Sequence, residues 1–223
     1  MLHLILSATV AHVSTAPARP PDGTYTYALV QANGSTIFTS ALVVASNGST
    51  FTVSETAKLP NGAVATTMTT WSSATLLPLS YKLQQGTIVV HGTITPTSIE
   101  FTGTNGSKDL SPLSYTLLPG TKYMLVYGGL NAFRMMLPYV IAAHPNESAT
   151  VGHINGVQRE VAEAGSAAPL PGGPAGDAVS VIALDSSLRK EQLTVYRNME
   201  TGAIDEERVS PGDVRMTLVH YVP

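Results

Sequence analysis

Large apolar residues alternate with small or polar ones in the first third of the chain. Tyr25, Tyr27 and Leu29 fall on one face of an extended segment, and the segment 36–45 repeats this alternation. A period of two residues is typical of a β-strand with one buried face. Threonine and serine fill many of the intervening positions, and β-branched threonine favours strand over helix. The pattern therefore predicts antiparallel β-structure.

Turn signals divide this region into strands of similar length. The dipeptide Asn-Gly occurs five times in the chain, and its first three copies are 14 residues apart. Asn-Gly between alternating segments is a strong signal for a β-hairpin. The spacing predicts a four-stranded meander with strands at 23–31, 36–45, 50–58 and 63–71.

The remainder of the chain also reads as mainly β, with one helical segment. Further strands are predicted between 79 and 103 and between 149 and 222, and the prolines within 110–120 predict a loop. The apolar stretch 123–143 favours a short helix near 130–137, ended by Pro138, although a strand fits the same residues. A Pro/Gly-rich loop is expected at 166–177.

The first 18 residues have features of an export signal. An apolar run from Leu2 to Val13 is followed by small residues spaced as signal peptidase requires. We therefore expect a signal peptide at 1–18, a single antiparallel β domain at 19–223, and a periplasmic or secreted protein. The alternative is that 1–18 form a buried first strand or short helix of a cytoplasmic protein. No stretch is long enough to predict a transmembrane span.

The composition excludes some classes of function. Charged residues make up 12% of the chain and the net charge is −3, so no basic surface for nucleic acid is expected. The chain has no cysteine, which removes disulfides, thiolate metal sites and a cysteine nucleophile. No nucleophile-elbow, phosphate-loop or zinc-protease motif is present. We therefore predict no catalytic residue, no metal site and no cofactor.

One group of residues remains to be inspected for enzymatic chemistry. His144 and His153 lie nine residues apart, with Glu147 between them. Imidazole and carboxylate groups that converge can bind a metal ion or exchange protons. If the chain is an enzyme, we expect these three side chains to meet in one cleft.

Aromatic and methionine residues are the candidates for binding an apolar ligand. They could line a cavity enclosed by a curved sheet and plugged by the short helix; the alternative is that they only form the core. The candidates are Trp71, Tyr81, Phe101, Phe133, Met135 and Met136.

The order of elements resembles a family of exported bacterial proteins of unknown function, whose fold is similar to that of the lipoprotein carriers LolA and LolB. The resemblance rests on the sequence GTYTY at 23–27, the meander, LPLSY at 77–81 and the apolar piece 130–137. It implies a single strongly curved antiparallel sheet, or open barrel, of about 9–11 strands around the helix. No functional residue of the family matches a position here, and the lipid-attachment cysteine of lipoproteins is missing.

The sequence thus leaves open three functions. The first is an exported cell-envelope protein that binds an apolar small molecule or acyl chain of a lipid in the concavity of its sheet. The second is an interaction or structural module without a pocket, which engages an envelope protein through a sheet edge or its Thr-rich face. The third is an enzyme, with the two histidines and Glu147 as its only recognisable site.

Overall fold

The structure, a computed structural model, describes residues 19–59, 62–127, 130–144, 147–153, 156–166, 177–186, 190–210, 212 and 214–223. The predicted signal peptide at 1–18 lies outside the described residues, as does most of the loop at 166–177. Side chains of residues 153–191 are also outside the description.

Within these ranges the chain forms sixteen strands and one helix. The elements are β1 (Gly23–Val30), β2 (Thr36–Asn47), β3 (Thr50–Lys58), β4 (Val64–Ser72), β5 (Pro78–Gln85), β6 (Ile88–Ile94), β7 (Ser98–Asn105), β8 (Lys108–Asp109), β9 (Leu113–Thr116), β10 (Tyr123–Val126), α1 (Leu130–Ala143), β11 (Ser148–His153), β12 (Gly156–Ser166), β13 (Asp177–Ser186), β14 (Lys190–Asn198), β15 (Ile204–Ser210) and β16 (Val214–Val222).

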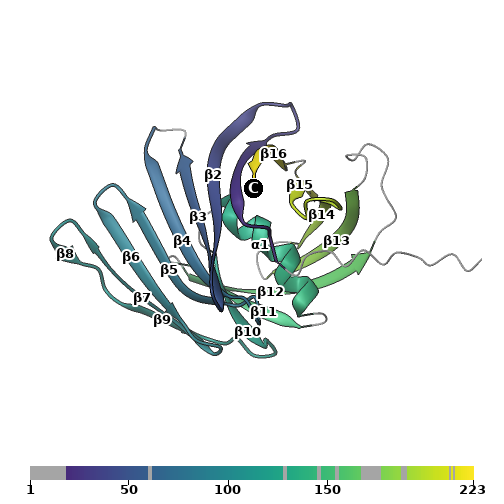
Figure 1. Ribbon diagram of the computed structural model, residues 1–223. Helices are drawn as coiled ribbons and strands as arrows, with labels where there is room; N and C mark the ends of the chain where they lie inside the picture. The colour runs from purple at the N-terminus through teal and green to yellow at the C-terminus, as the bar shows by residue number, and fades with distance from the viewer. Residues whose placement is uncertain are drawn as a thin grey trace, which may run out of the picture.

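All described strands belong to one sheet, so the predicted mainly β fold with a single sheet is confirmed. Their order is β10-β11-β12-β13-β14-β15-β16-β1-β2-β3-β4-β5-β6-β7-β8, and β9 also pairs with β7. Because β1 pairs with β16, the first and last strands are neighbours in the middle of the sheet. The β10–β11 pair is parallel, unlike the other pairs. Figure 1 shows the strongly curved sheet with α1 in its concavity.

The predicted meander is confirmed in β1–β4, whose ends agree with the expected ones within two residues. The turn between β2 and β3, however, is shifted by one residue from its Asn-Gly pair. Asn47 pairs with Thr50, so Gly48 is the first central residue of the hairpin, with φ of 62°. Gly86 and Gly106 occupy equivalent positions with φ of 59° and 62°. Glycine adopts this backbone conformation without steric cost.

The helix exists where the sequence predicted it, but it is longer. It continues through Pro138 to Ala143, whereas the prediction ended it at that proline. A proline inside a helix costs about 3 kcal/mol, since it removes a backbone hydrogen bond. The residues after it, Tyr139, Val140 and Ile141, are almost completely buried. Burial of these three side chains against the sheet offsets the loss and keeps the last turns helical.

The prediction of about 9–11 strands was too low. Residues 110–120, expected to be a loop, contain β9, and the apolar stretch before α1 begins with β10. β10 lies at one end of the sheet and packs against β5 and β7 near the other end. Met124 and Val126 of β10 join the core of β5–β7, while Tyr123 and Leu125 pack in the core around α1. The sheet therefore curls over its own edge strand without closing into a hydrogen-bonded barrel.

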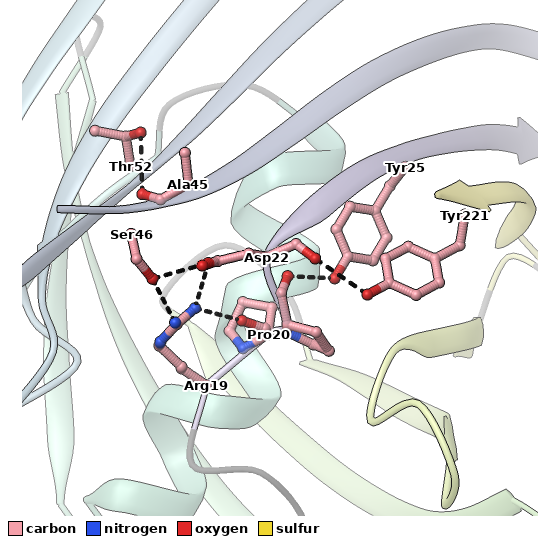
Figure 2. A network of polar contacts seen from close by, with 9 residues as sticks. Arg19, Pro20, Asp22, Tyr25, Ala45, Ser46, Thr52 and Tyr221 are labelled. Carbon is pink, nitrogen blue, oxygen red and sulfur yellow. Dashed lines mark hydrogen bonds and ion pairs between the residues drawn. The ribbon is translucent and has the colours of Figure 1, made fainter. Parts of the chain in front are cut away.

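A polar network fixes the start of the described chain to the sheet (Figure 2). Arg19 donates hydrogen bonds to Asp22 and to Ser46 of β2, and the hydroxyl of Tyr221 on β16 donates to the backbone oxygen of Asp22 at 3.1 Å. The ring of Tyr221 lies 4.7 Å from that of Tyr25. These contacts connect the entry to β1 with both neighbouring strands.

Candidate functional site

A cavity of about 160 Å³ lies on the concave side of β2–β5. Alternation along the strands turns these residues inward, because every second side chain of a strand faces the same side. Most of the lining groups are apolar. The lining residues are Phe38, Glu55, Ala57, Leu59, Ala65, Thr67, Tyr81, Leu83 and Gln85.

Glu55 is the charged group of this lining. It projects inward from β3 and is only 2% exposed. Its two carboxylate oxygens accept hydrogen bonds from the backbone N–H groups of Asn131 and Ala132, each at 3.2 Å. These amides belong to the first turn of α1, whose N–H groups have no partner within the helix. Glu55 therefore caps α1 from a strand far away in sequence.

A second polar contact joins the same helix end to the sheet. The side-chain amide of Asn131 donates a hydrogen bond to Ser40 Oγ at 2.8 Å. Both side chains are buried, with Asn131 at 0% and Ser40 at 2% exposure. The beginning of α1 is thus held by β2 and β3 together.

Burial dominates the electrostatics of Glu55. It raises the pKa of the Glu55 carboxyl above its usual range, because a buried carboxylate loses the solvation of its charge. Hydrogen bonds from Ser40 and from the helix amides oppose this rise. Burial, and then the nearby charge of Glu55, also raises the pKa of Tyr81, so its phenol remains protonated at neutral pH.

Thr67 supplies a further polar group to the cavity. It lies directly opposite Glu55 in the β3–β4 register and is 5% exposed. Its hydroxyl is buried and has no hydrogen-bond partner among the described residues. Buried polar groups of proteins are nearly always hydrogen-bonded, so a hydroxyl without a partner beside a cavity calls for an explanation.

The six residues proposed from the sequence divide between this cavity and the core. Tyr81 lines the cavity, and Phe101 packs edge-on against it with ring centroids 6.1 Å apart. Trp71 stacks on Phe51 at 6.4 Å instead. The three candidates on or near the helix are buried in the core around α1: Phe133, Met135 and Met136. The structure thus does not bring the six into one cluster.

Two of the three residues of the possible enzymatic site, His144 and Glu147, are in contact. His144 Nδ1 lies 3.2 Å from a carboxylate oxygen of Glu147, and the other ring nitrogen lies 2.7 Å from the backbone oxygen of Thr75. His153 belongs to β11, but its side chain is outside the description. The part of the chain that the structure describes contains no group of three potential metal ligands.

A second hollow, of about 430 Å³, lies over β14–β16. Arg208 and Arg215 face each other across β15 and β16 at this place. Arg208 is already engaged, since it contacts the carboxylate of Glu206 and lies 4.8 Å above the ring of Tyr196. The lining of this hollow is more polar than that of the cavity beside α1.

Glu55 and Thr67 were not singled out from the sequence, although a signal was present. Glu55 follows Phe51 and Val53 at intervals of two, which places a carboxylate on the buried face of β3. Thr67 lies four residues before Trp71 on β4, an even interval that also places it on the buried face. A charged residue in register with buried aromatic residues is rare unless it has a structural or binding role.

Comparisons with known proteins support the fold and assign no activity. No family model and no curated protein matches the chain. One similar solved structure is described as a crystal structure of a "Beta-barrel-like Protein of Domain of Unknown Function DUF1849 from Brucella abortus". It is 10% identical, with a TM-score of 0.53, and the match covers 91% of this chain and 98% of that one. This chain therefore shares its β-rich, barrel-like architecture with a protein of unknown function.

Proposed function

We propose that this chain is an exported cell-envelope protein that binds an apolar ligand in the concavity of its sheet. The observation that carries the proposal is the cavity of about 160 Å³ beside α1, which is lined mostly by apolar side chains. Apolar cavities of roughly 150 Å³ are large enough to hold a benzene molecule. The space suits a ring or a short part of an acyl chain.

The construction of the cavity supports this proposal. Neighbouring inward positions of β3 and β4 carry the small residues Ala57 and Ala65, which pair across the two strands. Larger residues such as Phe51 and Trp71 fill the equivalent positions at the other end of the same strands. The change from large to small side chains leaves the space open beside Glu55.

Two expectations from the sequence agree with the proposal. The resemblance to LolA and LolB implies a curved sheet that wraps around helices and receives an acyl chain. The apolar N-terminal run at 2–13 supports export. As a separate finding, no helix within the described ranges is long and apolar enough to cross a membrane.

The test is native mass spectrometry of the full-length chain, expressed in bacteria and purified from the periplasmic fraction without detergent. We expect an intact mass that lacks the first 18 residues, together with a bound mass that disappears after organic extraction. A clean mass without ligand, and no uptake of added toluene or short-chain alcohol, would refute binding and favour the interaction module. A cytoplasmic, unprocessed chain would refute export.

A matched pair of variants connects the ligand with the cavity. Ala57→Leu places a larger side chain in the cavity, and we expect it to abolish the bound mass. Thr56→Leu adds a leucine at the next position of β3, which faces outward and is exposed. It should retain the ligand. Loss of the ligand in both variants, or in neither, would contradict binding at this site.

A further inference from the structure

The polar side of the cavity has unused capacity to accept a hydrogen bond. A carboxylate has about four acceptor positions. Glu55 uses two of them for Asn131 and Ala132 and a further one for Ser40. Ser40 in turn accepts from the amide of Asn131. This leaves one acceptor position on a carboxylate that borders the cavity.

None of the described cationic side chains forms an ion pair that balances the charge of Glu55. Across the described residues, no lysine, arginine or histidine forms an ion pair with it, whereas the other buried glutamate, Glu207, lies 3.1 Å from Arg134. A buried carboxylate is stabilised by hydrogen bonds and by positive charge, and for Glu55 the described side chains and backbone supply only the hydrogen bonds. A ligand that donates a hydrogen bond or carries a positive charge would complete this environment.

Thr67 provides the second half of the polar site. Residues directly opposite each other on antiparallel strands have Cβ atoms about 4.5–5.5 Å apart, so the hydroxyl of Thr67 and the carboxylate of Glu55 can contact one small group. The hydroxyl can both donate and accept. Its lack of a partner, at 5% exposure, is an observation independent of the helix end that Glu55 caps.

We propose that the ligand carries a hydrogen-bond donor, an alcohol or amine group, on its apolar body, and that Glu55 and Thr67 hold this group while they exclude carboxylates. This inference rests on the proposed function. It names the class of ligand, since an ionised fatty acid would place a second negative charge beside Glu55 in a poorly solvated space. The apolar body of the ligand would contact Phe38, Tyr81 and Leu83.

Four probes of similar size test the proposal: toluene, benzyl alcohol, benzylamine and benzoate. Their dissociation constants are measured at pH 7 by titration calorimetry or ligand-observed NMR, with full-length protein whose native mass shows no bound ligand. We expect benzyl alcohol and benzylamine to bind at least tenfold more tightly than benzoate. Equal or tighter binding of benzoate would overturn the proposal.

Variants show whether the named residues cause this selectivity. Thr67→Val removes the hydroxyl and does not touch the helix cap. We expect it to weaken benzyl alcohol about three- to tenfold, in line with one hydrogen bond, and to leave toluene unchanged. Glu55→Gln should strengthen benzoate relative to benzyl alcohol, because an amide can donate to a carboxylate. An unchanged ratio of alcohol to toluene in Thr67→Val would overturn the proposal even if the Glu55 variant does not fold.

The outcomes separate the two proposals. Toluene binding without preference for the alcohol or amine would leave the proposed function intact and refute the donor selectivity. Failure of all four probes to bind would refute both.

Discussion

Helix α1 is held by two buried carboxylates, and their surroundings differ. Glu207 on β15 is 0% exposed and lies 3.1 Å from Arg134, the charged residue of the helix. Glu55 on β3 is 2% exposed and is held by backbone amides of the first helical turn. Both contacts connect the helix to the sheet, but among the described side chains only Glu207, of these two, has a cationic partner.

The side chains packed around the two carboxylates also differ. On the Glu207 side, the hydroxyl of Tyr139 donates to the backbone oxygen of Gly202 at 2.5 Å, and the guanidinium of Arg197 lies 4.3 Å above the same ring. On the Glu55 side, alanines and an unpartnered threonine hydroxyl border a cavity. The Glu207 carboxylate is thus paired with a cation of the helix, whereas the Glu55 carboxylate accepts from the helix backbone and borders a cavity.

The largest effect is expected from breaking the ion pair. Arg134→Met removes the cation and leaves Glu207 buried, so we expect the free energy of unfolding to fall by about 3 kcal/mol. Urea denaturation monitored by the fluorescence of Trp71 measures it.

The double variant Arg134→Met with Glu207→Leu is the control for this prediction. It removes both charges, and replacing a buried ion pair by apolar side chains is often neutral. It should therefore recover most of the lost stability. A double variant as unstable as the single one would mean that the helix depends on other contacts of Arg134.

The sequence predicted the elements whose signals are local. The meander β1–β4 follows from alternation and glycine turns, and both are read from neighbouring residues. The predicted end of α1 was wrong. Pro138 is a local signal for the end of a helix, whereas the helix continues because Tyr139 and Val140 are buried, and this burial depends on the sheet around them. β10 was missed for the same reason, since its four apolar residues gain their strand partner only from β11.

The site was less predictable than the fold. Aromatic and methionine residues were the natural candidates for an apolar pocket, but of the six candidates named from the sequence only Tyr81 lines the cavity. A cavity arises where small side chains coincide across strands, as Ala57 and Ala65 do, and this depends on register. The inward position of Glu55 could be read from the alternation of β3, but its partners on α1 lie 76 and 77 residues away.

An intermediate effect is expected at Glu55. Glu55→Ala removes the acceptor for two helix amides, and we expect the free energy of unfolding to fall by about 1–2 kcal/mol. Glu55→Gln keeps one acceptor oxygen and should lose less. If both variants are as stable as the original chain, α1 does not depend on this cap.

The stability of the same site should also depend on pH. Burial raises the pKa of Glu55 in the folded state above 4.5, its usual value. A raised pKa means that the folded chain binds the proton more tightly, so the contribution of this group is greatest below 4.5 and is lost as the pH rises through the folded value. The original chain should therefore gain stability relative to Glu55→Gln as the pH falls from 7 toward 4.5. Denaturation curves of both proteins across this range measure the difference, and a constant difference would contradict the shift.

The smallest change in the free energy of unfolding is expected at Thr67, and it is an increase where the other variants show a decrease. Its buried hydroxyl has no partner among the described residues, so Thr67→Val removes a polar group that is costly to bury and keeps a side chain of similar shape. Without ligand, the variant should be more stable by up to about 1 kcal/mol, as measured by urea denaturation. Thr150 of β11, which is 0% exposed, offers the control. Its hydroxyl oxygen accepts a hydrogen bond from the backbone N–H of Leu118 at 2.9 Å and lies 2.7 Å from the hydroxyl of Thr121, so Thr150→Val should lower stability. A loss of stability in Thr67→Val as large as in Thr150→Val would show that the Thr67 hydroxyl is satisfied within the folded chain, and the polar side of the cavity would then be complete without a ligand.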